Sequence, residues 1–398
     1  MLAPPFLGHY RFSPRALVPG ALFAAVAVVV LPPLCRHLSW RLLLPFSAVA
    51  AAGWAVALAV WDGHLRIGGP IARASEYLPA LLAVGSDPAA FLAGFADDVA
   101  HRRLPVHVNG HPPLMVLVLW VWDRLGASGS GWAAALVIGA GASAVAAIAL
   151  VLRELGDEKA ARRALPFLVL GPFAITVATS ADSFFLGVGA WAAAALAAGL
   201  RRRSWLLLGV AGALTGSLAY LSYGLLPFGA VLVAVGWLAV RRHRWPETSS
   251  AHRAALAAAF VVGLAVVPAL LTAGGFWWFD GVAATHRAWT LGKGDDRPYA
   301  YSFVADFAVL AVLVGPATVV AATRRPDRVP TVLAAASLLA LLVLALSGVT
   351  RLEVERIWLP FAPWLVVLTA ALPRRSRRWL LLNAACALTF QSLVLDVW

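Results

Sequence analysis

The sequence predicts an all-α membrane protein with about 12 transmembrane helices and a long first external loop. Of its 398 residues, 61% are hydrophobic and only 13% are charged, and the mean hydropathy is +0.82. Soluble domains are close to half apolar and a quarter charged, so this balance is that of an integral membrane protein. The apolar stretches lack the alternating pattern of barrel strands, which leaves helices as the spanning elements.

Twelve apolar stretches are candidate transmembrane helices, because a bilayer core requires about 20 residues of helix. The predicted spans are residues 16–35, 42–61, 131–152, 165–181, 183–200, 205–221, 225–240, 254–273, 303–322, 329–347, 357–372 and 379–396. We expect residues 1–398 to form a single membrane domain. In it, two spans within 16–61 precede the external loop 62–130, and the remaining bundle covers 131–398.

Basic residues mark one side of this predicted bundle. Of the 32 Lys and Arg residues, twenty lie in or beside six short connections, and fourteen of the 19 acidic residues fall on the opposite side. The positive-inside rule places the six connections in the cytoplasm. The net charge of +13 is therefore an orientation signal, and no nucleic-acid partner is expected. The basic connections are residues 36–41, 153–163, 201–203, 241–253, 324–328 and 374–378.

The stretch HVNGHPPLMVLVLWVWDRLG, residues 107–126, opens with polar residues and continues with an apolar segment. The chain is outside before this stretch and inside after residues 131–152, so the number of crossings between must be odd. The apolar segment 113–125 is too short to be a further crossing. It is expected to form a juxtamembrane helix, with Trp120 and Trp122 at the membrane interface.

The segments in which a reaction could occur are the connections predicted to be external. The longest of these are residues 62–130, 274–302 and 348–356. The sequence has no G-x-G-x-x-G motif after a strand, no P-loop and no His-Glu-x-x-His motif. An enzyme of this kind would therefore use an activated substrate that is already in the membrane.

One succession of features along residues 42–200 is typical of a known architecture. An outward span leads into a long external loop with an acid near its start, and His111-Pro112-Pro113-Leu114 then opens the juxtamembrane helix. This layout resembles the GT-C superfamily of glycosyltransferases, above all the protein O-mannosyltransferase and lipid A aminoarabinose transferase group and its actinobacterial relatives. In that group the step is typically Lys-Pro-Pro-Leu.

The resemblance implies an enzyme that takes a sugar, such as mannose or arabinose, from a polyprenyl-phosphate donor in the outer leaflet. The acceptor would be a glycan, a lipid or a protein. The expected location is the plasma membrane, with membrane lipids around the bundle and the active site on the extracytoplasmic side. The Ala-rich and Arg-rich composition, in which Lys159 and Lys293 are the two lysines, is typical of a high-GC bacterium.

The resemblance also implies a catalytic carboxylate early in the first external loop. This chain has no Asp-Glu pair there, and offers Glu76 in ASEYLPALL and Asp62 at the membrane edge. We predict that Glu76 is the general base for the acceptor hydroxyl, with Asp62 as the second candidate. The alternative interpretations are a solvated loop glutamate for Glu76 and an interfacial cap of the span 42–61 for Asp62.

His107 and His111 frame the segment HVNGHPP. His111 stands at the position of the family's Lys, so the resemblance implies that it faces the phosphate of the sugar donor. The alternative is a surface histidine that caps the juxtamembrane helix. Two histidines four residues apart before a Pro-Pro break make a poor metal site, so no metal is predicted. A divalent cation stays open as a cofactor because some GT-C enzymes use one.

Arginines of the later external loops are candidates for binding the phosphate, because a guanidinium group can bond two phosphate oxygens at once. Arg351 and Arg356 lie in TRLEVERIWLPF, and Arg297 lies in DDRPYAYS. Tyr299 is predicted to line a groove for the sugar or the prenyl chain, and Asp182 to contact the acceptor. The alternatives are a self-neutralising charge cluster for the arginines and a turn-forming role for Asp182.

Two other classes of function stay open: a multispanning transporter and a non-catalytic membrane scaffold. Twelve spans are common in transporters, which usually have ionisable residues or broken helices at mid-membrane depth and two repeated halves. This chain has spans that are almost free of charge, no clear repeat, and a 69-residue external stretch at 62–130 without a counterpart. These observations favour the enzyme.

Overall fold

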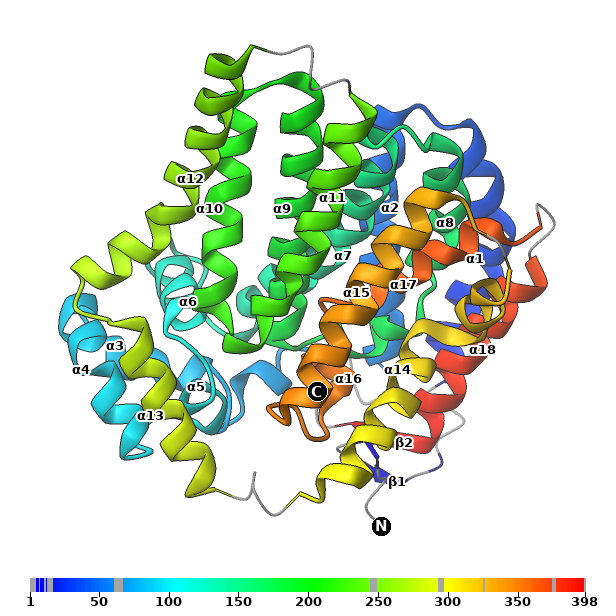
Figure 1. Cartoon of the computed structure of the whole chain (residues 1–398). Coiled ribbons are helices and arrows are strands. Elements are labelled where there is room, and N and C mark those ends of the chain that lie inside the picture. The colour runs from blue at the N-terminus through cyan, green and yellow to red at the C-terminus, as the bar shows by residue number, and fades with distance from the viewer. Residues whose placement is uncertain are drawn as a thin grey trace.

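The computed structural model of the chain is a bundle of helices (Figure 1). Two short antiparallel strands, β1 (Gly8–Tyr10) and β2 (Val394–Asp396), join segments near the two chain ends. The rest of the regular structure in the described residues is helical, which confirms the all-α class. The structure describes residues 5–6, 8–10, 12, 17–60, 67–243, 249–292, 297–324, 326–373 and 377–396.

Eight helices in the described part are long and apolar enough to cross a membrane. Their apolar side chains suit hydrocarbon, and helical hydrogen bonding satisfies their backbone without water. The bent pair Leu78–Val84 and Pro88–Ala100, whose halves meet at 113°, could be one further crossing. The eight are α1 (Leu17–His37), α2 (Trp40–Ala59), α7 (Ser130–Glu154), α9 (Ala181–Arg202), α12 (Ser250–Ala273), α14 (Tyr299–Ala322), α15 (Arg328–Ser347) and Tyr223–Arg242, which joins the 3-10 helix η7 (Tyr223–Phe228) to α11 (Gly229–Arg242).

The other predicted spans take a different form. Residues 205–221 and 379–396 correspond to shorter helices, α10 (Trp205–Leu221) and α18 (Arg377–Leu393). The prediction of continuous helices at 165–181 and 357–372 is wrong. The first segment forms α8 (Glu158–Val169) and the 3-10 helix η6 (Pro172–Thr176), and the second forms α16 (Val354–Ile357), α17 (Ala362–Val366) and the 3-10 helix η9 (Val367–Ala371).

A proline explains the first break, because proline removes a backbone donor and its ring clashes with the preceding turn. Pro172 opens η6 directly after Gly171, whose backbone is extended. Irregular backbone at membrane depth needs hydrogen-bond partners inside the protein. The Trp54 indole donates to the Gly171 carbonyl at 3.3 Å, and the Ser337 hydroxyl donates to the Phe361 carbonyl at 2.9 Å.

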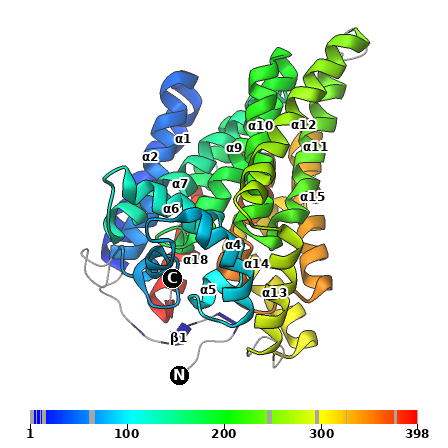
Figure 2. The same ribbon diagram turned by 90° about the vertical axis from the view of Figure 1, so that its left-hand side faces the viewer.

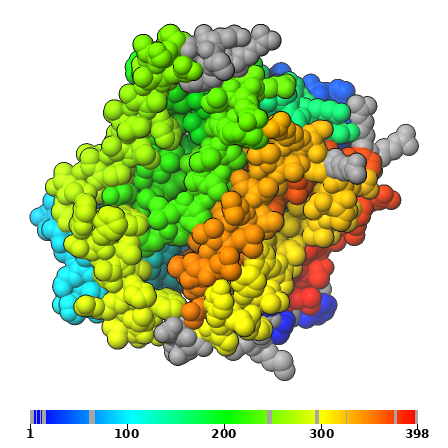
Figure 3. Space-filling view, viewed as in Figure 1, coloured from blue at the N-terminus to red at the C-terminus, as the bar shows by residue number. Residues whose placement is uncertain are grey.

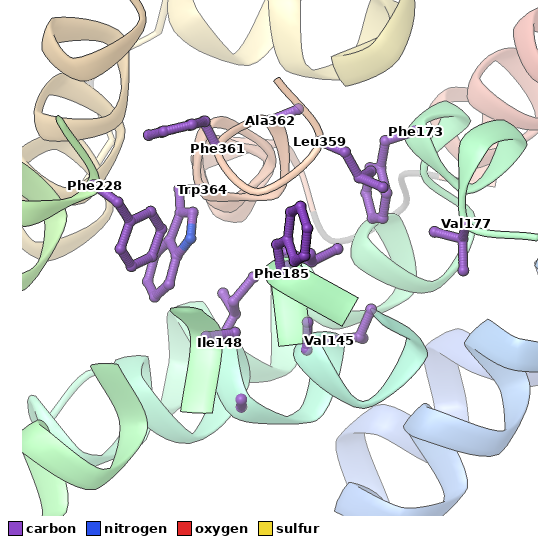
Figure 4. Packing of buried hydrophobic residues seen from close by; sticks show 14 of the residues in the cluster. Val145, Ile148, Phe173, Val177, Phe185, Phe228, Leu359, Phe361, Ala362 and Trp364 are labelled. Atoms are coloured by element: carbon purple, nitrogen blue, oxygen red, sulfur yellow. The ribbon is translucent and has the colours of Figure 1, made fainter. Parts of the chain in front are cut away.

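The two broken segments pack into one core with α7 and α9 (Figure 4). Phe185 of α9 lies at the centre of this view, with Phe173 of the first broken segment nearby. Phe228 meets the rings of Phe361 and Trp364 edge-on, with centroids 5.7 and 6.0 Å apart. This close packing fixes the position of α16 relative to α9, on which the site described below depends.

Basic connections that are far apart in the sequence lie together at one end of the bundle, near the top of Figure 1. The Arg162 guanidinium donates to the carbonyls of Cys35 and Leu38 at 2.9 and 3.1 Å, which ties α8 to the turn between α1 and α2. Arg201 and Arg202 bond the Glu154 carboxylate at 3.1 Å each, which ties α9 to α7.

Much of the segment between α2 and α7 lies at the opposite end, where its helix α4 (Pro88–Ala100) packs against α13 (Trp278–Thr290). In Figure 2, α4, α5 and α13 lie together at the lower end, away from the turn between α1 and α2. The segment folds into η4 (Pro70–Ala72), η5 (Leu78–Ala80), α3 (Leu81–Val84), α4 (Pro88–Ala100), α5 (Val106–Asn109) and α6 (Leu114–Arg124).

The apolar segment 113–125 forms a helix, α6, as predicted. Met115 and Leu119 are buried on one face. The Trp120 indole donates to the Gly85 carbonyl at 2.9 Å, which joins α6 to the end of α3.

Helices α12 and α15 cross the face of the molecule shown in Figure 3. Both helices carry exposed aliphatic side chains, among them Val261, Val262 and Leu270 of α12 and Leu339 and Val343 of α15. Exposed aliphatic side chains along helices of this length suit contact with lipid tails.

Candidate functional site

Glu76 and His107 form a largely buried pair at the end of the bundle away from the basic connections. The Glu76 amide donates to the Arg73 carbonyl at 2.9 Å, and the His107 amide donates to the Ser75 carbonyl at 2.9 Å. These bonds dock α5 on the turn that contains Glu76. Glu76 Oε1 lies 2.6 Å from His107 Nδ1, and Glu76 is only 6% exposed. The other predicted acid, Asp62, lies outside the described residues.

His111 packs beside this pair as an uncharged ring. Its Nδ1 lies 2.7 Å from the His107 carbonyl, so this nitrogen donates its hydrogen. The ring meets those of Tyr77 and Phe185, with centroids 5.9 and 6.1 Å away. Burial lowers the pKa of His111 to about 4, with Arg356 adding to the effect and Asp182 opposing it. In a neutral ring whose Nδ1 donates, Nε2 is an acceptor, which is a poor arrangement for binding phosphate.

Asp182 and Arg356 form a second buried pair. Asp182 lies in the first turn of α9 and Arg356 in the short helix α16, and their side chains meet at 2.9 Å. Each side chain is only 6% exposed. Burial opposes the charge of Arg356, but Asp182 and Glu353 outweigh it, so the pKa of the guanidinium is raised. Removing two charges from water is costly unless they pair with good geometry, as they do here.

Glu353 connects Arg356 to Arg297. It bonds Arg356 at 3.0 Å and also forms an ion pair with Arg297. Burial would raise the pKa of Glu353, but the two arginines hold it below its ordinary value. Leu352 and Glu353 have φ angles of 65° and 60°, a region that L-residues rarely adopt. This backbone turn directs Glu353 toward both arginines.

Arg351 and Tyr299 lie at the edge of this group. Arg351 donates to the Arg297 carbonyl at 3.2 Å, and Arg297 donates to the Arg351 carbonyl at 2.6 Å. The Arg351 guanidinium lies 5.3 Å from the Trp289 ring and 5.8 Å from the Tyr299 ring. The Tyr299 hydroxyl donates to the Leu346 carbonyl at 3.2 Å, and its ring is partly exposed.

Tyr77 connects the two buried pairs. Its hydroxyl is buried and has no hydrogen-bond partner among the described residues. Burial raises the pKa of Tyr77 well above its ordinary value, and the charges of Asp182 and Glu76 raise it further while Arg356 opposes them. Charged groups of both pairs therefore affect the pKa of the same hydroxyl, so the two pairs belong to one cluster.

Three residues of this region were not predicted as site residues: Tyr77, Glu353 and Asp306. Asp306 is 1% exposed within α14, and its Oδ1 accepts from the Leu352 amide at 3.2 Å. A lone acid inside an apolar span is itself a signal of function, and it could have identified Asp306. No comparable signal in the sequence identifies Glu353, because its partners depend on the fold of the 348–353 segment.

Comparison of the chain with protein-family models, with curated proteins and with solved structures found no match. The cluster itself offers a carboxylate–imidazole pair that can accept a proton and several guanidinium groups that can bind an anion. Within the described residues, no three His, Cys, Asp or Glu side chains are arranged to hold a metal ion.

Proposed function

We propose that the protein is a membrane glycosyltransferase that moves a sugar from a polyprenyl-phosphate donor to an acceptor hydroxyl. The observation that supports this most is the Glu76–His107 pair, which lies largely buried in one cluster with Arg356 and Asp182. A base beside cations is what sugar transfer from a lipid phosphate requires. The resemblance of residues 42–200 to the GT-C layout supports the same function.

In the proposed reaction, the acceptor oxygen forms a bond to the anomeric carbon of the sugar while the bond from that carbon to the phosphate oxygen breaks. The stereochemistry inverts in this single displacement. The acceptor proton passes to the Glu76–His107 pair, and the polyprenyl phosphate leaves with the electron pair of the broken bond. Glu76 is the proposed base, and its contact with His107 Nδ1 holds the carboxylate in position.

Arginines of the cluster would stabilise the phosphate as it leaves. Arg356 already faces the carboxylates of Asp182 and Glu353, which would repel a phosphate group. The partly exposed Arg297 and Arg351 are better placed to contact the donor from the surface. Arg356 then acts by keeping this group of charges in position.

We also propose that the chain crosses the plasma membrane twelve times and that the cluster faces away from the cytoplasm. The eight long apolar helices are supplemented by α10, α18 and the two broken segments, so consecutive crossings can alternate in direction. The grouping of the basic connections at the other end supports this orientation.

A transporter is the second candidate, because the structure contains broken helices. The segments after α8 and α16 are irregular and buried, and α14 bends at Gly315 and Pro316, where φ of Gly315 is 78°. Discontinuous helices of this kind form the substrate sites of many secondary transporters.

A survey of lipid donors would separate the two functions. The purified protein in nanodiscs is incubated with polyprenyl-phosphate mannose, arabinofuranose or glucose, and released polyprenyl phosphate is measured by mass spectrometry. We expect release from at least one donor, and loss of this release in Glu76→Gln. Intact donors, together with movement of a lipid-linked or free sugar across the membrane of proteoliposomes, would support the transporter instead.

A further inference from the structure

A second group of buried polar side chains lies between α14 and the segment that precedes α16. Ser302 and Asp306 are one turn apart on α14, so they share a face of that helix. Each is 1% exposed. The Leu352 amide donates to Asp306 Oδ1 at 3.2 Å, which joins this face to the segment that also contains Thr350.

Three oxygens of this group have no hydrogen-bond partner among the described residues: Ser302 Oγ, Asp306 Oδ2 and Thr350 Oγ1. The Nε1 donor of Trp358 is also buried without a partner among the described residues, and the Trp358 ring packs on Phe307, the residue after Asp306, with centroids 5.3 Å apart. Buried polar groups are costly without partners, and native proteins leave few of them. Several on adjoining elements indicate a place where a polar ligand supplies the missing hydrogen bonds.

The mixture of donors and acceptors identifies the class of ligand. The Ser302 and Thr350 hydroxyls both donate and accept, the Asp306 carboxylate accepts, and the Trp358 indole donates. A metal ion would use the oxygens alone, and the nearby positive charge of Arg297, which acts on Asp306, would repel it. A ligand with several neutral hydroxyl groups, each able to donate and accept a hydrogen bond, would satisfy all four of these side chains.

This group adjoins the candidate site through two consecutive residues. The Leu352 amide bonds Asp306, while the next residue, Glu353, bonds Arg356, which in turn bonds Asp182. The positive φ angles of Leu352 and Glu353 allow one short turn to serve both groups. A ligand held at Asp306 would therefore lie close to the charged cluster.

We propose that Ser302, Asp306 and Thr350 bind the hydroxyl groups of the sugar that the lipid donor carries. This inference rests on the glycosyltransferase function proposed above. Asp306 Oδ2 would accept a hydrogen bond from a sugar hydroxyl, and the Ser302 and Thr350 hydroxyls would exchange hydrogen bonds with its neighbours. The lipid phosphate would not depend on these three residues.

The test compares the binding of two lipids to the protein in nanodiscs: plain polyprenyl phosphate and polyprenyl phosphate that carries mannose, arabinofuranose or glucose. The wild type should prefer the lipid with its sugar. Asp306→Asn should reduce this preference on the order of tenfold or more, since a hydrogen bond to a charged group is lost. Its affinity for the plain lipid should not change. Ser302→Ala and Thr350→Val should give smaller reductions.

Thr318→Val is the matched control. Thr318 is buried on the same helix, and its hydroxyl already donates to the Val314 carbonyl at 2.7 Å, so the sugar preference should stay at the wild-type value. Binding of neither lipid by the wild type would overturn the proposed function and this inference with it. Plain-lipid binding with an unchanged sugar preference in all three variants would overturn the sugar site alone. If Asp306→Asn does not fold, a wild-type preference for the sugar-bearing lipid in both Ser302→Ala and Thr350→Val would also overturn the sugar site alone.

Discussion

Each end of the bundle contains a buried carboxylate paired with arginine, but the two pairs differ in exposure. At the basic end, Glu154 is 1% exposed, while the side chains of Arg201 and Arg202 that bond it are 47% and 55% exposed. At the other end, Asp182 and Arg356 are both 6% exposed. The first pair keeps its cations in contact with solvent, and the second keeps both charges away from it.

This difference indicates different roles. Exposed guanidinium groups stay hydrated, so Glu154 can hold α7 and α9 together at little cost. Two buried charges cost much more, and the strained turn at Leu352 and Glu353 adds to that cost. A bundle that needed only a structural link would not require them. Buried charges of this kind in a membrane protein are typical of functional sites.

Replacing an arginine at each end is expected to give the largest difference in the rate of sugar transfer. Arg356→Ala should slow sugar transfer on the order of 10²-fold, because it leaves the carboxylates of Asp182 and Glu353 without their shared partner and misplaces the charges that Arg356 holds in position. Arg356→Lys should recover only part of the rate, because a point charge cannot bond two carboxylates in the same geometry. Arg201→Ala should transfer at the wild-type rate, since Arg202 still bonds Glu154. Equal loss in Arg356→Ala and Arg201→Ala would remove the distinction between the ends.

Replacing a histidine at each end is expected to give a smaller difference in the rate of sugar transfer. His107→Gln should reduce transfer roughly tenfold to a hundredfold, because the imidazole that holds the Glu76 carboxylate in position is lost. His243→Gln is the matched change at the basic end, where the His243 ring contacts the Glu154 carbonyl. It should transfer normally. Rates measured with the best donor of the survey would check both, and an unaffected His107→Gln would leave Glu76 to act alone.

A further effect concerns the pH dependence of stability. The pKa of His111 is about 4 in the fold, below its ordinary value of 6.5, so the unfolded chain binds the proton more tightly. The stability due to the neutral ring is therefore present above pH 6.5 and is lost as the pH falls toward 4. The Tm of the wild type in detergent should fall over this range by more than that of His111→Gln. Parallel curves for the two proteins would contradict the assignment of a neutral His111 in the fold.

Cysteine variants can report which side of the membrane each end of the bundle faces, and these variants are expected to change activity least. Ser128→Cys lies in the segment between α2 and α7, which is proposed to be external, and Arg253→Cys lies at the basic end; both positions are exposed. An impermeant thiol reagent applied outside intact cells should label the former and not the latter. The parent chain, with its buried Cys35 and partly buried Cys386, is the background control. The reverse labelling would overturn the proposed orientation.

Much of the candidate site was predictable from charged residues in the connections. Glu76, His107, Asp182 and Arg356 were all selected from the sequence, and the fold brings them into one cluster. Their pairing was not predictable. Hydropathy and motif order place residues in loops, but they do not reveal that α5 docks on the turn at Glu76.

The breaks in the predicted spans were missed for a related reason. An irregular buried segment is as apolar as a helix, so hydropathy alone does not distinguish residues 165–181 from a continuous span. Pro172 was visible, but prolines also occur inside intact helices of this chain, such as Pro45 in α2. Whether a proline breaks a helix depends on whether neighbouring side chains can satisfy the backbone that it frees.

The most direct test of the difference between the ends replaces one buried glutamate at each. Glu76→Gln and Glu154→Gln keep the shape of the side chain and remove its charge, and single-turnover transfer from the best donor is measured for both. We predict that Glu76→Gln binds the donor but transfers sugar roughly 10²–10⁴-fold more slowly, the usual worth of a positioned base. Folded Glu154→Gln should transfer at the wild-type rate. Normal transfer by Glu76→Gln, above all with Asp62→Asn inactive, would contradict the assignment of Glu76 as the base.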